Sequence, residues 1–273
     1  MDSGLIAYID LVCRNIANKD TKKLRESISI TPVNNQGIVR ARFPTPLEFD
    51  LYPIPDRFRD VIIQYLKVMK SIYIENDIEQ SFNGINEMVN ALLRAANTET
   101  NWINGAVMNS CSELINIYKV KQKSNPEPEF SEASEDAEFD STTTTISLIE
   151  KLVRTMNKAF TISLNDKNLV LNQSRRIDIY FFLSHLIKLY FRMGKIQLAK
   201  SIEKALKGTR SELPPLNWGT TSLQYLITYL YFSALISLDD SDFVAAESKL
   251  NEALLLSNHC TNQKAITKQQ EKI

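Results

Sequence analysis

A few residues have side chains whose types could support catalysis or metal binding. His185 lies within an apolar helical stretch, where a hydrogen-bonded core histidine is a better interpretation than a ligand or a base. His259 and Cys260 are adjacent but have no second pair nearby, which disfavours a zinc site. Gly194-Lys195 lacks the preceding glycine and the following hydroxyl of a phosphate-binding loop. We therefore expect no cofactor, no metal site and no enzyme activity.

Basic side chains are a second source of possible chemistry. Three of them share one helix face, and three more follow in a polar segment: Lys151, Arg154 and Lys158, then Lys167, Arg175 and Arg176. Because basic side chains can contact the phosphates of a nucleic acid, this cluster predicts a nucleic-acid site at Lys167, Arg175 and Arg176. In the alternative, the cluster is a solvated face and both arginines brace the start of the next helix. Because the net charge is zero, we expect binding by this chain alone to be weak.

A second basic group lies between two helices that are rich in aromatic residues. Its candidate partner-binding residues are Lys195, Lys200, Lys204 and Lys207, with Tyr225 and Tyr229 on the following helix. Aromatic side chains at these spacings belong mostly to a core, and a minority could line a groove for an extended peptide. The alternative is that all of these tyrosines are core and all of these lysines are solvated.

The composition is that of a globular protein. The chain has 273 residues, of which 44% are hydrophobic and 23% are charged. Cys13, Cys111 and Cys260 lie far apart in apolar stretches, which is typical of buried thiols in a reducing compartment. The sequence begins without a signal peptide, and no apolar run is long enough to span a membrane.

Hydrophobic periodicity predicts an all-α fold built from tetratricopeptide-like helical repeats stacked in a superhelix. Four segments are expected: an N-terminal helix followed by a proline-rich extended segment (residues 1–55), helical repeats (56–120), a disordered acidic insertion (121–145), and further helical repeats (146–273). Among the helices, we expect Ile177–Met193 to be central and buried, and Trp218–Leu238 to be a long helix.

An internal repeat supports the helical hairpins. In both Tyr190–Leu206 and Leu235–Leu254, a bulky helix ends in a short turn and a second helix presents small residues. These small residues, which would let two helices approach closely, are Ala199 and Ala205 in the first hairpin and Ala246 and Ala253 in the second.

Several motifs resemble a known family. They are ETNW at Glu99–Trp102, FTISLNDKNLVLNQSRR at Phe160–Arg176, and LPPLN at Leu213–Asn217, followed by the alanine-containing repeat. Together they resemble the fungal PCI-domain proteins related to the twelfth, loosely associated subunit of the COP-nine signalosome. Those proteins are in turn related to PCI subunits of the nuclear TREX-two mRNA-export complex. The resemblance covers roughly residues 56–273.

The resemblance implies a scaffold of helical repeats capped by a winged helix, which would lie beyond Ile273 in a fragment or be lost in a naturally short protein. It implies pairing with a second PCI protein and with a small acidic peptide of the proteasome-lid type. It also implies a nuclear role in transcription elongation, mRNA processing or export, with RNA or DNA contact. The alternatives are a signalosome subunit that supports deneddylation and a direct RNA- or DNA-binding module.

Overall fold

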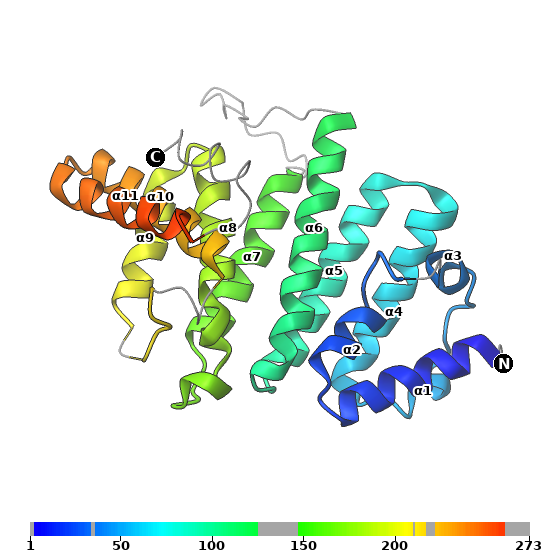
Figure 1. Ribbon diagram of the computed structural model, residues 1–273. Helices are drawn as coiled ribbons and strands as arrows, with labels where there is room; N and C mark the ends of the chain where they lie inside the picture. The colour runs from blue at the N-terminus through cyan, green and yellow to red at the C-terminus, as the bar shows by residue number, and fades with distance from the viewer. Residues whose placement is uncertain (1–2, 34–35, 125–146, 210, 217–221, 260–273) are drawn as a thin grey trace, which may run out of the picture. The chain divides into compact units, whose positions relative to one another are not determined.

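The computed structural model describes residues 3–33, 36–124, 147–209, 211–216 and 222–259. All regular secondary structure in these ranges is helical, which confirms the predicted all-α fold (Figure 1). No helix among them is long and apolar enough to cross a membrane. The chain divides into an N-terminal unit, residues 1–158, and a C-terminal unit, residues 159–273.

The N-terminal unit contains long helices and several short ones. In chain order they are α1 (Ser3–Ala17), α2 (Thr21–Ser27), α3 (Gln36–Ala41), η1 (Glu48–Leu51), α4 (Asp56–Lys70), η2 (Ser71–Glu75), α5 (Ile78–Ala96), η3 (Asn101–Ile103), α6 (Asn104–Ser124) and the first part of α7 (Leu148–Leu164). Here η2 is a π-helical turn, whereas η1 and η3 are 3-10 turns.

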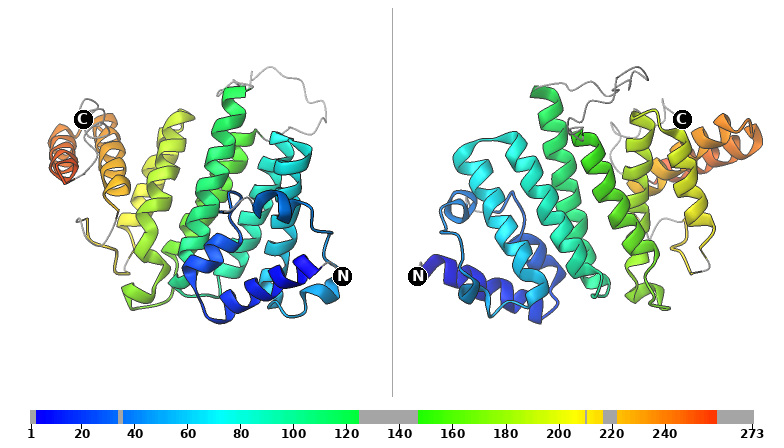
Figure 2. Two further views of the ribbon diagram at one scale, coloured as in Figure 1. Left: turned by 45° about the vertical axis from the view of Figure 1, so that its right-hand side comes forward. Right: turned by 180° about the vertical axis from the view of Figure 1, so that it is seen from behind.

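The long helices α4, α5 and α6 pack side by side as consecutive antiparallel neighbours (Figure 2). Gly84 of α5 lets α4 come close, since a Cβ atom there would lie 2.8 Å from a methyl group of Val68. Phe82 and Tyr118 place their rings 6.4 Å apart between α5 and α6. Polar contacts join α7 to α5, the best buried being the hydrogen bond from Thr155 to Asn86.

Two expectations for this unit need correction. Residues 31–55 are not extended throughout, because α3 and η1 form within them. The acidic insertion was expected from residue 121, but α6 continues to Ser124, and residues 125–146 lie outside the described ranges. Both differences reflect tertiary packing: Gly37 of α3 lies against the ring of Tyr73, and Lys121 pairs with Glu79 of α5.

The C-terminal unit consists mainly of two helical hairpins. After the end of α7 and the 3-10 turns η4 (Leu171–Gln173) and η5 (Arg175–Asp178), its helices are α8 (Ile179–Arg192), α9 (Ile196–Lys207), α10 (Leu223–Asp239) and α11 (Phe243–Ser257). The helix predicted from Ile177 thus starts after η5. For the helix predicted from Trp218, residues 218–221 lie outside the described ranges, and α10 begins at Leu223 after its N-cap residue Ser222.

The same turn closes both hairpins. Gly194 and Ser241 adopt positive φ angles of 66° and 60°, and the amide of the following residue bonds back to a carbonyl in the preceding helix. These bonds run from Lys195 to Tyr190 and from Asp242 to Ser237, each at 2.9 Å. This arrangement satisfies carbonyls at the helix end that would otherwise have no partner. The shared geometry supports the internal repeat seen in the sequence.

The small residues of the repeat behave as predicted at three positions out of four. Ala199, Ala246 and Ala253 are buried. Ala205 is exposed, so the prediction for this residue is wrong. Ala205 lies on the solvent side of α9. The next residue, Leu206, is on the buried side instead.

Candidate interaction sites

The polar segment before α8 contains the predicted nucleic-acid site. Lys167 is exposed, but Arg175 and Arg176 are buried. Arg176 is only 1% exposed and donates to three backbone carbonyls of its own chain: Nε to Glu212 at 3.1 Å, Nη2 to Asn168 at 2.5 Å, and Nη1 to Asp166. Its guanidinium therefore holds a loop together and is turned away from solvent.

Asp166 organises the other half of this segment. Its carboxylate accepts hydrogen bonds from the Arg175 amide at 2.7 Å and the Ser174 hydroxyl at 3.1 Å, and it forms an ion pair with the Arg175 side chain. Burial alone would raise the pKa of Asp166, but these hydrogen bonds and the arginine charge hold the pKa below its usual value. Ser174 in turn caps η5 by accepting from the Arg176 amide.

This geometry corrects the site predicted at Arg175 and Arg176. Both side chains are directed to internal partners, which favours the alternative that they brace the start of the helix. The physical reason is that guanidinium groups have several fixed donors and can satisfy backbone carbonyls that a non-helical segment leaves without partners. Of the three predicted residues, only Lys167 presents its charge to solvent.

The predicted partner-binding lysines of α9 differ in their surroundings. Lys200 forms ion pairs with Asp239 at 2.6 Å and with Asp240, both at the end of α10. Lys207 forms an ion pair with Glu203 at 2.8 Å. Lys195 is exposed at the start of α9, and Lys204 is exposed and makes no ion pair within the described ranges. The structure therefore leaves less free positive charge on α9 than its sequence indicates.

The two predicted tyrosines are packed to different extents. Tyr229 is buried against Tyr180, with ring centroids 5.3 Å apart, and therefore belongs to the core. Tyr225 is half-buried, and its ring meets Phe181 edge to face at 5.1 Å and lies near His185. His185 is half-buried with the rings of Phe181 and Tyr225 against it, so the interpretation as a core histidine holds only in part.

Beneath the α9 lysines lies a buried polar cluster. Glu203 accepts hydrogen bonds or ion pairs from Ser233, Lys207 and Lys249, and Lys249 also donates to Ser237 at 2.8 Å. Burial would raise the pKa of Glu203, but its bonds to Lys207 and Ser233 and the Lys249 charge lower the pKa. The cluster joins α9, α10 and α11, so its role is structural.

A second buried polar cluster, in the N-terminal unit, was not identified from the sequence. It surrounds residues 27–31, a short segment after α2 whose backbone groups are held mainly by side chains. Arg40 and Tyr8 donate to the Ser27 carbonyl, Tyr65 donates to that of Ser29, and Glu113 accepts from the Ile30 amide. The signal available in the sequence is the pair of charged residues, Arg40 and Glu113, within otherwise apolar helix faces.

Glu113 and Arg40 are bonded to neutral groups only. Glu113 accepts from the Ser29 hydroxyl at 2.6 Å and from Asn109, while its second carboxylate oxygen has no hydrogen-bond partner. Burial raises the pKa of Glu113, and the bonds from Ser29 and Asn109 oppose this only in part. In the described ranges, no group of histidine, cysteine and acidic residues could hold a metal ion.

Comparison with known proteins shows which proteins the chain resembles. No family model matches the chain. Over its full length the chain is 51% identical to Protein CSN12 homolog of Debaryomyces hansenii, of which it covers 62%. It is 27% identical over 72% of its length to Cop9 signalosome complex subunit 12 of Saccharomyces cerevisiae, covering 44% of that protein. It is also 24% identical over 41% of its length to PCI domain-containing protein 2 of Xenopus laevis.

The helical hairpins and these similarities show that the chain resembles PCI-type helical-repeat proteins. More narrowly, the chain is similar over its whole length to a fungal CSN12 homolog, which confirms the resemblance drawn from ETNW and the segment Phe160–Arg176. The chain spans less than two thirds of the length of these relatives.

Proposed function

We propose that this chain is the helical-repeat part of a non-enzymatic scaffold subunit in an assembly that contains a second PCI protein. The observation that carries the proposal is the 51% identity to a CSN12 homolog over the whole chain. The stacked hairpins provide broad surfaces, and such surfaces suit binding to other subunits.

Within that role we propose a nuclear complex that acts in transcription elongation, mRNA processing or export. The alternative is a signalosome subunit that supports deneddylation, and the name of the Saccharomyces cerevisiae relative favours it. Affinity purification of the native full-length protein distinguishes the two. Recovery of a second PCI protein with splicing or elongation factors is expected. Recovery of signalosome subunits alone would support the alternative, and recovery of neither would contradict the scaffold.

We further propose that a small acidic peptide of the proteasome-lid type docks beside Lys204 and Tyr225. Lys204 is exposed, and Tyr225 has only part of its ring buried, so both are accessible. Lys200 and Lys207 are engaged with acidic residues of their own chain and contribute less. Charge would speed the encounter, and the aromatic contact would supply most of the affinity.

A pull-down of such a peptide at low and high salt tests this docking. Lys204→Glu is expected to reduce capture, most strongly at low salt, because exposed charges are screened by salt. Lys167→Glu changes a lysine on another segment that is also exposed, and it is the matched control. Equal capture by both variants would exclude this surface.

Direct nucleic-acid contact remains a prediction that now depends on Lys167. We expect weak binding, roughly micromolar or weaker, because the net charge is zero. Lys167→Glu is expected to reduce it, and unchanged retention on a single-stranded RNA column would contradict that expectation.

A further inference from the structure

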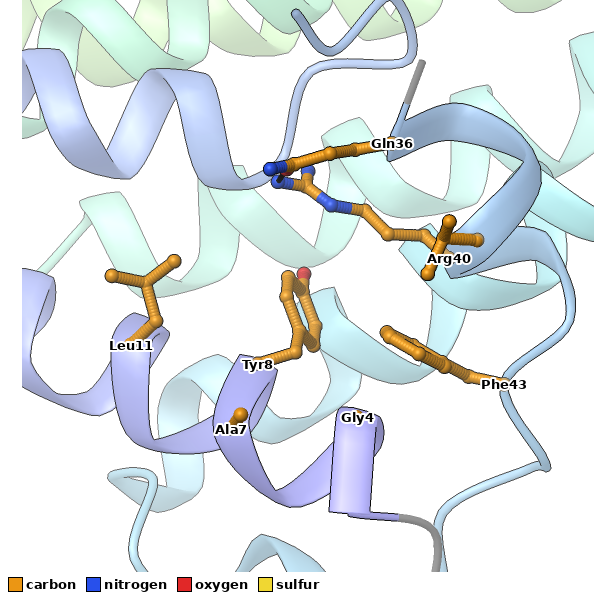
Figure 3. Close-up of a pocket in the computed structure, with 8 residues that line it drawn as sticks. Gly4, Ala7, Tyr8, Leu11, Gln36, Arg40 and Phe43 are labelled. Atoms are coloured by element: carbon orange, nitrogen blue, oxygen red, sulfur yellow. Dashed lines mark hydrogen bonds between the residues drawn. The ribbon is translucent and has the colours of Figure 1, made fainter. Parts of the chain in front are cut away.

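A pocket lies between α1 and α3, entirely within the N-terminal unit (Figure 3). Its volume is about 270 Å³. The residues that line it come from both helices and from the segment just after α3: Gly4, Ala7, Tyr8, Leu11, Gln36, Val39, Arg40 and Phe43. Most of this lining is apolar, and Leu11 and Val39 are exposed.

Arg40 places a buried positive charge beside the pocket, and that charge is bonded to neutral groups. Its side chain is 6% exposed, and its guanidinium is bonded only to neutral groups: the Ser27 carbonyl at 2.9 Å, the Tyr65 hydroxyl at 2.8 Å, Gln36 Oε1 at 2.7 Å, and more weakly the Glu26 carbonyl. It also lies 5.2 Å from the centre of the Tyr8 ring. Within the described ranges, no carboxylate reaches ion-pair distance of Arg40, and no acceptor faces its Nε.

The nearest carboxylate in this hydrogen-bond network is separated from Arg40 by two residues. Glu113 binds the hydroxyl of Ser29, the Ser29 carbonyl accepts from Tyr65, and Tyr65 accepts from Arg40. Buried cations are normally paired, because removing a charge from water costs free energy that neutral partners repay only in part. An incoming carboxylate at this pocket would therefore be attracted to a cation that has no counter-charge among the described residues.

Apolar side chains also reach the opening. Leu11 of α1 and Val39 of α3 line the pocket and expose large parts of their side chains. A volume near 270 Å³ is at the small end for ligand pockets and suits one or two side chains more than a whole cofactor. An extended segment could place one side chain inside and lay its neighbours on this rim.

We propose that the pocket between α1 and α3 binds a peptide segment of a partner protein in which an aspartate or glutamate lies next to a large apolar residue. The apolar side chain packs against Ala7, Leu11 and Phe43, and the carboxylate approaches Arg40. This site is separate from the docking surface proposed beside Lys204, and its test uses the present chain without any of the partners proposed above.

A peptide array supplies the probes. It pairs Asp or Glu with Leu, Ile, Phe or Tyr in a constant glycine–serine frame, and each peptide has an Asn or Gln counterpart. The best acidic peptide is then titrated into the full chain by fluorescence anisotropy. We expect its amide counterpart to bind about tenfold more weakly or worse, because the charge-assisted bond to Arg40 is lost.

Substitutions test whether the peptide binds in the pocket between α1 and α3. Val39→Glu adds a negative charge at the opening and is expected to weaken the acidic peptide at least about tenfold. Val120→Glu on α6 is the matched control, because Val120 and Val39 are 46% and 56% exposed. Arg40→Gln is expected to act like Val39→Glu, and its melting is checked because Arg40 also holds Ser27.

Three outcomes would overturn the proposal: equal binding of acidic and amide peptides, equal binding by Val39→Glu and Val120→Glu, or no peptide binding at all. In the last case, binding of octanoate would show that the pocket takes a free aliphatic acid instead of a peptide. Because Val39→Glu changes an exposed residue, the proposal remains testable even if Arg40→Gln fails to fold.

Discussion

In the N-terminal unit, the guanidinium of Arg40 and the carboxylate of Glu113 are buried among neutral partners. In the C-terminal unit, by contrast, the partly buried carboxylate of Asp166 and the buried carboxylate of Glu203 face cations. Burial dominates at Glu113 and raises its pKa, whereas opposite charges and hydrogen bonds outweigh burial at Asp166 and Glu203 and lower theirs. The same residue type thus has opposite electrostatic behaviour in the two units, because the groups brought next to it differ.

The difference has a functional side. A buried charge that is paired with a charge of opposite sign is neutralised, and its role is structural. A buried cation without one, such as Arg40, retains an attraction for an external anion. The sequence predicts a binding site at Arg175 and Arg176, but both side chains are buried against groups of their own chain. Arg40, which the sequence does not single out, lines a pocket.

The largest expected effect is that of Arg176→Ala in the C-terminal unit. It removes the donors to the partly buried carbonyls of Asp166, Asn168 and Glu212, together with the packing of a side chain that is only 1% exposed. We expect a loss of about 3–5 kcal/mol in the free energy of unfolding, as for other buried networks that are broken on one side. Chemical denaturation followed by circular dichroism measures it.

The control for this prediction is Lys167→Ala, which changes an exposed residue of the same segment. It is expected to stay within about 0.5 kcal/mol of the original chain. If Arg176→Ala costs no more than Lys167→Ala, the bracing role assigned to Arg176 is wrong.

A pair of isosteric substitutions compares the buried carboxylates of the two units directly. Glu203→Gln leaves Lys249 and Lys207 without their counter-charge and is expected to cost about 1–3 kcal/mol of unfolding free energy. Glu113→Gln removes a charge that only neutral groups solvate, while its carbonyl oxygen can still accept from Ser29 and Ile30. This second change is therefore expected to be neutral or stabilising, within about 1 kcal/mol at neutral pH.

Denaturation of the two variants at the same pH and salt concentration makes the comparison. A larger loss for Glu113→Gln than for Glu203→Gln would reverse the proposed contrast. Equal losses would mean that the nature of the partners does not control the cost of these buried carboxylates.

The smallest effects concern pH. Because the folded pKa of Glu113 lies above 4.5, its contribution to stability is present below that pH and is lost as pH rises through the folded pKa. Asp166 and Glu203 have folded pKa values below 3.8 and 4.5, so their contributions are present above these values and are lost as pH falls through the folded pKa. Carboxyl-carbon NMR titration measures each group, and a pKa of Glu113 below that of Glu203 would contradict the assignment.

Much of the fold could be predicted from the sequence, because helices on one side of a core repeat their apolar residues at helical spacing. The stripe that includes Phe58, Ile62 and Tyr65 predicted α4, and all three side chains are buried. The ends of the helices were less predictable from the sequence. Asn76 and Glu79 indicated a capping box, but Asn76 adopts a positive φ of 54° and Asp77 caps α5 instead. A turn of this kind depends on which carbonyls the preceding helix leaves open.

The sequence by itself determined the all-α class, the hairpins and the family resemblance, since these depend on local periodicity and on motifs contiguous in the chain. Only the tertiary structure decided which charges are free. Arg176 is buried because Glu212 and Asn168 turn their carbonyls toward it, and Arg40 lines a pocket because α1 and α3 leave space there. The partners of a buried charge come from other segments of the chain. The local sequence pattern therefore does not predict its environment.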